Sequence, residues 1–179
     1  MCKEFKNKYT AIACINNKNA IGKNGDLLFK IKSDLNNFRM LTTGDVIIMG
    51  RSTFESLSCK PLKDRINIIL TTKVDYEVDS EFDNVYICHS FEDVDELCDA
   101  YFSDKELFVI GGGSVYKQAF DLGIISKAII TLVNDDQDGD VYFHDIANDD
   151  RYKIIFKTMS IRDHIDDNYY RYIIYKKKD

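Results

Sequence analysis

The chain has 179 residues, of which 45% are hydrophobic and 12% aromatic, a composition that excludes global disorder. At roughly 150 residues per domain, this length predicts a single domain over residues 1–179. The 24 basic and 30 acidic residues give a net charge of −6, which argues against a nucleic-acid partner held by the overall field.

Apolar runs rich in Ile and Val alternate with helical patterns along the chain. In chain order, the pattern predicts a strand over Tyr9–Ile15, a helix over Lys32–Leu41, a strand over Val46–Gly50, a short helix over Arg51–Leu57, strands over Ile66–Thr71 and Val85–Cys88, a helix over Phe91–Phe102, a strand over Leu107–Ile110, a helix over Ser114–Phe120 and a strand over Lys127–Asn134. Two longer strands, Tyr152–Ile161 and Tyr169–Lys176, are expected to form a hairpin around residues 163–168. This alternation predicts an α/β fold: a mixed, mostly parallel sheet of about eight strands, with about four helices on both faces and an antiparallel C-terminal hairpin.

One acid, Asp34, lies on the apolar face of a predicted helix. Asp34, Phe38 and Leu41 are spaced i, i+4 and i+7, which places them on one side. A buried carboxylate costs free energy unless something binds it, and burial raises its pKa. Asp34 is therefore either a first-turn acid that favours the positive end of the helix or a functional acid.

Three consecutive glycines, Gly111 to Gly113, join a predicted buried strand to a helix. Glycine lets a ligand approach the backbone closely, and the free N–H groups of a helix N-terminus bind phosphate well. An ordinary tight turn does not need three glycines. The segment therefore favours a phosphate-binding turn.

Polar clusters follow two other predicted strands. Arg51, Ser52 and Thr53 begin a helix after one strand, and Thr71, Thr72 and Lys73 close another. Ligands of open α/β sheets bind beyond the carboxyl ends of the strands. Together with the glycines, these clusters are consistent with a dinucleotide that carries several phosphates, although each alone also fits a solvated helix start or strand end.

Two further signals are weaker. Arg65 precedes a strand and is either a clamp for a substrate carboxylate or a surface side chain. The segment from Asn134 to Asp145 has the acid spacing of a calcium loop, but its flanks are strand-like and its twelfth residue is Asp rather than Glu. The five cysteines contain no C-x-x-C pair and the three histidines are scattered, so we expect neither a metal site nor a disulfide framework.

Five segments carry a more specific pattern. They are Ala20–Gly22, Asp34 with Phe38, Val46–Ser56, Pro61–Leu70 and Ile110–Tyr116. In this order, and over nearly the whole chain from Tyr9 to Tyr175, the sequence resembles the dihydrofolate reductase family. The resemblance implies NADPH-dependent reduction of 7,8-dihydrofolate to 5,6,7,8-tetrahydrofolate, with hydride transfer to pterin C6 and protonation at N5.

The resemblance also assigns roles to individual residues. It implies that Asp34 is the acid of the pterin pocket, supported by Thr131 and by Phe29 on a closing loop over Ile21–Ile31. The implied substrate-binding residues are Ile12, Cys14, Leu27, Asp34, Phe38, Leu57, Leu62, Ile110 and Arg65, the last as the clamp on the glutamate carboxylate. The implied cofactor-binding residues are Cys14, Ile21, Gly22, Gly50, Arg51, Ser52, Thr53, Thr71, Thr72, Lys73, Ile110, Gly111, Gly112, Gly113, Ser114, Val115 and Tyr116, with a cis peptide between Gly111 and Gly112.

The sequence departs from the family pattern at three positions. Phe29 and Leu28 stand where the family usually has Trp and commonly has Pro, and Phe29 has no ring N–H to hold a water near the pterin. Ser114 stands where many members have Arg, so the preference for NADPH rests on Arg51, Thr72 and Lys73.

Two alternatives stay open. One is a related-fold reductase of a pyrimidine intermediate in riboflavin synthesis, against which Arg65 and the Asp34–Phe38 pair argue. The other is a catalytically silent folate- or nucleotide-binding module, which Phe29 favours.

The first eight residues lack the apolar core of a signal peptide, and the apolar runs are far shorter than the ~20 residues that span a bilayer. We therefore expect a cytoplasmic monomer that acts on a small molecule, without a membrane or nucleic-acid partner.

Overall fold

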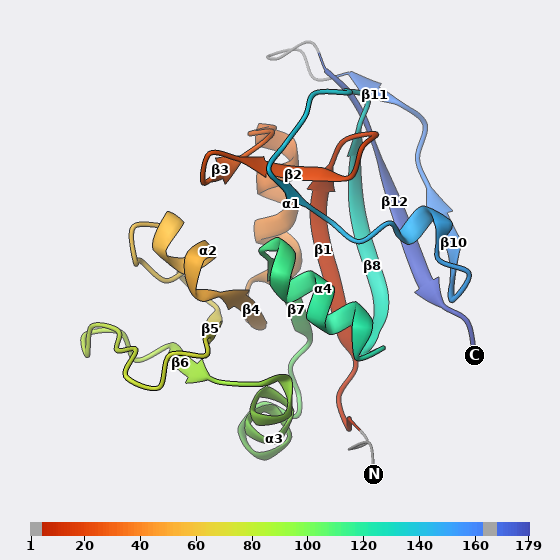
Figure 1. The fold of residues 1–179 in the computed structure, drawn as a ribbon. Helices are drawn as coiled ribbons and strands as arrows, with labels where there is room; N and C mark the ends of the chain where they lie inside the picture. Colours follow the sequence, from red (N-terminus) through yellow and green to blue (C-terminus); the bar gives the residue numbers. More distant parts are fainter. Residues whose placement is uncertain (1–4, 163–167) are drawn as a thin grey trace.

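The computed structural model describes residues 5–162 and 168–179, and a central twisted sheet runs through it (Figure 1). The sheet contains β1 (Tyr9–Ile15), β4 (Val46–Gly50), β5 (Ile66–Leu70), β6 (Val85–Cys88), β7 (Leu107–Gly111), β8 (Ile125–Val133), β10 (Tyr152–Lys157) and β12 (Tyr169–Lys177), with β11 (Ile161–Arg162) paired to β12. The strand order is β10-β12-β8-β1-β7-β4-β5-β6. The pairs from β8 to β6 are parallel, and β12 and β10 are antiparallel, which confirms the predicted sheet.

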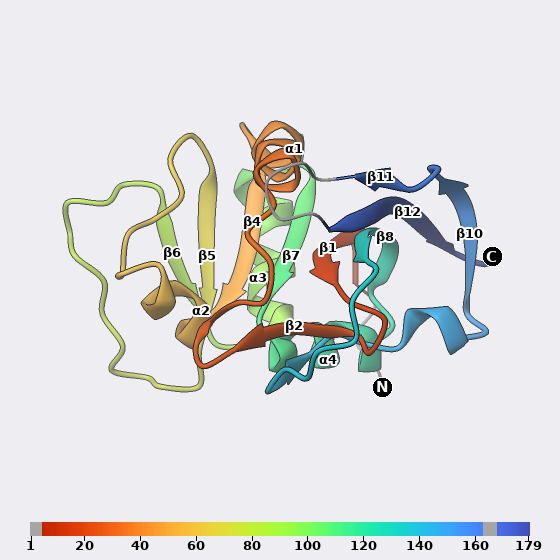
Figure 2. The same cartoon turned by 90° about the horizontal axis from the view of Figure 1, so that it is seen from above.

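Helices cover both faces of this sheet, as expected. They are α1 (Lys32–Thr42), α2 (Arg51–Ser56), α3 (Phe91–Tyr101) and α4 (Gly113–Asp121). Figure 2 shows α1 and α4 on opposite sides. The alternation of side chains along β4 explains the two layers: Val46 and Ile48 pack in the core cluster that contains residues of α3 and α4, whereas Ile47 and Met49 pack on the side of Phe38 in α1. Among the described residues, no helix is long and apolar enough to cross a membrane.

A second, smaller sheet is the main difference from the predicted elements. It has the order β3-β2-β9 and consists of β2 (Ala20–Lys23), β3 (Asp26–Leu27) and β9 (Val141–Tyr142), so the expected loop over Ile21–Ile31 is partly strand. Asn24 and Gly25 have φ angles of 55° and 79° between the paired residues Lys23 and Asp26. Such a turn closes a two-residue hairpin, for which Asn-Gly is a strong sequence signal.

The C-terminal hairpin also differs in its first strand. The predicted strand over Tyr152–Ile161 is two strands, β10 and β11, separated by residues 158–160. The expected turn at residues 163–168 lies almost wholly outside the described residues. A short 3-10 helix, η1 (Ile146–Asn148), precedes β10.

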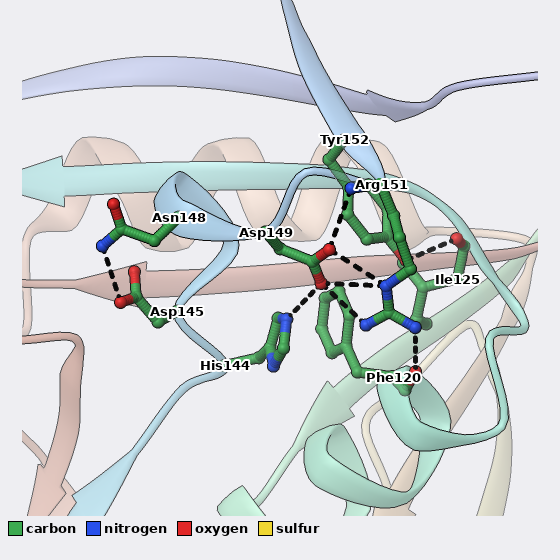
Figure 3. A network of polar contacts seen from close by, with 8 residues as sticks. All are labelled: Phe120, Ile125, His144, Asp145, Asn148, Asp149, Arg151 and Tyr152. Carbon is green, nitrogen blue, oxygen red and sulfur yellow. Dashed lines mark hydrogen bonds and ion pairs between the residues drawn. The ribbon is translucent and has the colours of Figure 1, made fainter.

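A polar network fastens the start of β10 to the end of α4 (Figure 3). Asp149 Oδ2 lies 2.6 Å from His144 Nε2 and accepts a hydrogen bond of 2.7 Å from Arg151 Nη2. Arg151 Nη1 donates to the Phe120 carbonyl at 3.1 Å, and the Phe120 ring stacks on His144 with 4.2 Å between centroids. The Arg151 guanidinium holds the pKa of Asp149 well below its ordinary value.

The substitution Asp149→Asn is expected to lower the free energy of unfolding at pH 7 by about 1.5–3 kcal/mol, the range for hydrogen bonds to charged groups. Because the folded pKa of Asp149 is depressed, its contribution is full above the ordinary value of 3.8 and is lost as the pH falls through the folded pKa. Urea titrations should therefore show a smaller difference from the parent protein at pH 3. The exposed neighbour Asp145 is the control, and an equal loss in Asp145→Asn would contradict the assignment.

Candidate active site

A cavity of about 910 Å³ lies at the carboxyl ends of the parallel strands. Its walls come from β1, β4, β7, β8 and the segment after β5, and include Cys14, Gly50, Ile110, Thr131 and Thr72. All of the site residues predicted from the sequence line this cavity except Lys73 and Gly111. The parallel strands explain this convergence, since their carboxyl ends meet at one edge of the sheet.

Asp34 supplies the acid of this cavity from the first turn of α1. Its Oδ1 accepts a hydrogen bond from the Thr131 hydroxyl on β8. Burial raises the pKa of Asp34 above its ordinary value, while hydrogen bonds from Thr131 and Cys14 act in the opposite direction. This partner on another element favours a functional acid over a residue that serves only the helix end.

Apolar side chains form the walls around Asp34. Phe38, Leu57, Leu62 and Ile110 pack against the buried cluster that contains Ile12. These residues and Asp34 line a largely apolar slot, which suits a flat heterocycle with ring N–H groups.

The segment between β3 and α1 supplies the rest of the apolar wall. Phe29, like Cys14 and Tyr172, packs against the buried cluster of Ile31, Val133 and Tyr170, in which Ile31 is fully buried. Leu27 lines the cavity but is 55% exposed, so it lies at the rim. Ile31 therefore anchors one end of the segment that the family resemblance assigns to the closing loop.

Arg65 lines the cavity beside Phe38. Its Nε donates to the Lys63 carbonyl at 3.0 Å, its Nη1 to Thr42 Oγ1 at 3.3 Å, and its guanidinium lies 5.9 Å from the centroid of the Phe38 ring. Burial and the neighbouring charge of Arg39 lower the pKa of Arg65. Two cations thus line one end of the apolar slot, where an anionic group of a ligand can bind.

The glycine turn lies on the other side of the cavity. The peptide between Gly111 and Gly112 is cis, as the family resemblance implied. Gly112 caps α4 without a side-chain hydrogen bond. A Cβ atom on Gly113 would lie 2.9 Å from Val141 Cγ1, and one on Gly112 would lie 3.2 Å from Thr53 Oγ1. The missing Cβ atoms therefore let the turn pack closely against Thr53 and Val141. Gly112 and Gly113 also line the cavity, and the N–H groups at this helix start fit the phosphates of a dinucleotide.

Hydroxyl and cationic groups surround the glycine turn. Arg51 Nη1 donates to Glu55 Oε1 at 2.7 Å, and its guanidinium lies 6.0 Å from the centroid of the Tyr76 ring. Ser52, Thr53, Thr72 and Ser114 also line the cavity. This set of donors fits an anionic dinucleotide.

Two predicted cofactor residues stand apart from this lining. The backbone N–H of Lys73 donates to Thr71 Oγ1 at 3.2 Å, but Lys73 does not line the cavity. The Cβ of a side chain on Gly111 would lie 2.8 Å from the Tyr116 ring. Gly111 therefore allows Tyr116 to pack behind the turn, where the Tyr116 hydroxyl donates to the Ile12 carbonyl at 2.6 Å.

The structure adds residues that the sequence did not single out. Arg39, Gln118 and Val141 line the cavity, as does His89, whose Nδ1 lies 2.8 Å from the Thr71 carbonyl. Arg39 and His89 are polar residues in a helix and after a strand, where most such residues are solvated. No local sequence pattern distinguishes Arg39 and His89 from ordinary solvent-exposed polar residues.

The acids of the calcium-like segment have other partners. Asp140 accepts a hydrogen bond of 2.7 Å from the Asn24 backbone, Asp138 lies 2.7 Å from Lys18 Nζ, and Asp135 accepts from the Gln137 backbone at 2.8 Å. Among residues 5–162 and 168–179, no three His, Cys, Asp or Glu side chains form a group that could hold a metal ion. Asp140 instead ties β9 to the turn between β2 and β3.

The fold and the cavity define a class: an α/β enzyme with a glycine turn suited to a dinucleotide beside an apolar slot that contains the buried Asp34. The family model for dihydrofolate reductase matches residues 8–177. The chain is 32% identical to dihydrofolate reductase of Bacillus subtilis (strain 168) over 159 residues, covering 89% of this chain and 88% of that protein. It is 30% identical to the Staphylococcus haemolyticus enzyme over 170 residues, covering 95% and 96%.

A solved structure gives the same result. Dihydrofolate reductase from Enterococcus faecalis, complexed with NADP(H) and RAB-propyl, matches with a TM-score of 0.83 and 27% identity, covering 98% of this chain and 99% of that one. The chain therefore belongs to the dihydrofolate reductase family.

The hydrogen bond from Thr131 to Asp34 generates a direct prediction. Thr131→Val keeps the shape but removes a donor that favours the carboxylate, so the pKa of Asp34 should rise by about 1–2, given 1.5–3 kcal/mol for a charged hydrogen bond and 1.36 kcal/mol per unit. Carboxyl ¹³C NMR titration, with the Asp34 signal assigned from Asp34→Asn, measures this rise. The control is Thr10→Val near the start of β1, which should leave the pKa of Asp34 unchanged. If the pKa of Asp34 does not change in Thr131→Val, the Thr131 hydroxyl is not a hydrogen-bond donor to this carboxyl.

Proposed function

We propose that the chain catalyses NADPH-dependent reduction of 7,8-dihydrofolate to 5,6,7,8-tetrahydrofolate at this cavity. The observation that carries the proposal is the Asp34 carboxyl, which accepts a hydrogen bond from Thr131 in a largely apolar cavity that Gly112 and Gly113 also line. Membership of the dihydrofolate reductase family supports the same reaction.

Asp34 orients the substrate and handles the proton. Its carboxylate accepts hydrogen bonds from the amino and ring N–H groups of the pterin and helps to deliver a proton to N5. Phe38, Leu57 and Ile110 enclose the ring and exclude water, which strengthens the hydrogen bonds to Asp34. Arg65 binds the glutamate carboxylate of the substrate, and its stacking on Phe38 places it beside the pterin slot.

The cofactor supplies the hydride that C6 receives. The backbone around Gly112 and Gly113 and the start of α4 would hold its pyrophosphate, because the helix end carries free N–H groups and partial positive charge. Arg51 with Thr72 would read the phosphate that distinguishes NADPH from NADH. Their place in the cavity supports this role.

We propose that Phe29 closes the slot above the pterin. It packs against the buried cluster of Ile31, Val133 and Tyr170 and offers apolar bulk but no side-chain hydrogen-bond donor. Proton delivery in this chain therefore relies on Asp34 and the groups that contact it.

We further propose that the chain is a single-domain monomer that acts on a small molecule in the cytoplasm and does not bind nucleic acid. The net charge of −6 supports the last point, since phosphate backbones are held by basic surfaces. The direct test mixes the purified chain with NADPH and dihydrofolate and follows NADPH absorbance. A steady fall that requires both compounds is expected, and no fall with correctly folded protein would refute the proposal.

Asp34→Asn should slow hydride transfer by about 10²–10⁴-fold, the usual contribution of a positioned acid, because Asn cannot take up or release the proton. Burial raises the pKa of Asp34 in the folded state, so at a pH above the ordinary pKa of 3.8 the ionisation of Asp34 lowers the stability of the folded protein. Asp34→Asn removes this cost, and the variant should therefore melt at an equal or higher temperature. In the parent enzyme the rate should fall as the pH climbs through this raised pKa. Single-turnover kinetics and thermal melting of the same preparation test both effects. If folded Asp34→Asn keeps the parent rate of hydride transfer, Asp34 does not take part in the mechanism.

Arg65→Leu should raise KM for dihydrofolate by roughly 10- to 100-fold, from the 1.5–3 kcal/mol of a charged hydrogen bond. It should barely change the affinity for a pterin that lacks the glutamate tail. Lys63→Leu removes an exposed cation two residues away and is the matched control. Equal weakening of both ligands in Arg65→Leu would make Arg65 structural, through its bonds to Lys63 and Thr42.

A further inference from the structure

His89 lines the cavity at a position that the sequence did not predict. It directly follows β6, and its Nδ1 lies 2.8 Å from the Thr71 carbonyl. Thr71 has the corresponding position after β5, since its backbone N–H donates to the Cys88 carbonyl at 3.1 Å. The imidazole therefore lies beside the segment of Thr71 and Thr72, which is expected to contact the cofactor.

The hydrogen bond to Thr71 fixes the roles of the two ring nitrogens of His89. A carbonyl oxygen can only accept, so Nδ1 carries the proton and is the donor. Within residues 5–162 and 168–179, Nε2 has no hydrogen-bond partner. Nε2 is therefore the nitrogen that a ligand can use. It accepts a hydrogen bond when the ring is neutral and donates one when the ring is an imidazolium.

Basic side chains are few around this cavity. Among the residues that the structure describes, those that line it are Arg39, Arg51, Arg65 and His89. Arg39 and Arg65 belong to the end of the apolar slot, which leaves Arg51 and His89 for the dinucleotide. Arg51 Nη1 already forms an ion pair of 2.7 Å with Glu55. A phosphate with two negative charges would therefore be stabilised there by a second cation.

The order of the strands places His89 at the end of a row of phosphate-binding candidates. β7, β4, β5 and β6 are consecutive parallel neighbours, and they are followed by the glycine turn, Arg51, Thr71 and His89 respectively. Neighbouring strands lie about 4.8 Å apart, so the backbones of Arg51 and His89 are separated by about 10 Å. A dinucleotide with its pyrophosphate at the glycine turn can extend along this row and place a further phosphate between these two side chains.

We propose that His89 is a further specificity-determining residue for the cofactor: its imidazolium donates Nε2–H to the 2′-phosphate that distinguishes NADPH from NADH. The neutral ring offers no such donor. The preference for NADPH is therefore greatest at acidic pH and falls as the imidazole loses its proton, which histidine side chains ordinarily do near pH 6.5. This inference rests on the cofactor site of the proposed function.

The other charged or titratable groups near His89 lie on α2, α3 and β6. Asp93 of α3 accepts hydrogen bonds of 2.9 and 3.1 Å from the backbone N–H groups of His89 and Ser90. Burial acts to raise the pKa of Asp93, but these hydrogen bonds bring it below its ordinary value, so Asp93 is an anion at neutral pH. Arg51 of α2 lines the same cavity, and burial raises the pKa of Cys88 to about 11, so that thiol is neutral. Asp93 and Arg51 act on the imidazolium in opposite directions, and the bound phosphate adds a strong attraction.

Calorimetric titrations of the full chain with NADP⁺ and with NAD⁺, at pH 6 and pH 8 and equal ionic strength, test the proposal. His89→Gln keeps an N–H donor for the Thr71 carbonyl but never carries a charge. At pH 6 it should weaken NADP⁺ by about 5- to 10-fold, between the effects of an exposed ion pair and a hydrogen bond to a charge, and NAD⁺ by less than about 2-fold. At pH 8 the variant and the parent should bind alike. Comparison with the parent at each pH cancels the titration of the phosphate itself, which occurs near pH 6.

Two further variants separate the charge of His89 from its packing. His89→Lys carries a permanent cation, so its preference for NADP⁺ at pH 8 should exceed that of the parent. Lys153→Gln removes an exposed cation on β10, at the opposite end of the strand order, and should change neither affinity. Titrations at pH 7 in two buffers of different ionisation enthalpy count the protons taken up with NADP⁺. The parent should take up more protons than His89→Gln.

Equal weakening of NADP⁺ and NAD⁺ at both pH values would make His89 structural, through its bond to Thr71, and would overturn the proposal. An unchanged NADP⁺ affinity of His89→Gln at pH 6 would do the same. If His89→Gln does not fold, His89→Lys decides, because a preference no stronger than that of the parent at pH 8 contradicts a role for the charge.

The two proposals fail separately. If the dinucleotides bind with the expected pattern but the chain does not reduce dihydrofolate, the proposed function fails and the role of His89 stands. If the chain reduces dihydrofolate and His89→Gln binds as the parent does, the function stands and the role of His89 is lost. If neither dinucleotide binds, both proposals are wrong.

Discussion

The hydrogen bond between the Thr131 hydroxyl and the Asp34 carboxyl is the contact on which the site depends. It joins the first turn of α1 to β8, and it keeps an acid at the end of an otherwise apolar slot. Burial raises the pKa of Asp34, and the hydrogen bond that the Thr131 hydroxyl donates from the sheet acts in the opposite direction by favouring the charged carboxylate. The slot can therefore be apolar enough to enclose a heterocycle and still present one proton-handling group.

The same sheet edge divides the cavity into two subsites. Phe38 and Arg65 lie on the side of Asp34, where a ring and a carboxylate can bind. The Gly111–Gly113 turn lies on the other side, where the start of α4 offers backbone N–H groups. Ile110 lines the cavity near the end of β7, directly before the glycine turn.

Local patterns predicted most of the fold because they follow from local physics. β1, β4 and β6 begin and end where apolar runs begin and end. The hairpin at Asn24 and Gly25 could also have been found, since its turn signal is in the sequence, but β9 could not. That strand has two residues, and its pairing with β2 depends on the fold between them. Likewise, one apolar run, Tyr152–Ile161, became two strands because pairing with β12 interrupts it.

The sequence by itself determined the class of the sheet, the acid on an apolar helix face, the glycine turn and, through the resemblance, the family and its reaction. Only the tertiary structure decided which side chains meet. The resemblance implied that Thr131 supports Asp34, but these residues are 97 positions apart and meet only in the fold, where Cys14 on β1 is the register partner of Thr131. No local pattern encodes that meeting, because it follows from the strand order β8-β1-β7, which places the carboxyl ends of distant segments side by side and leaves α1 above them.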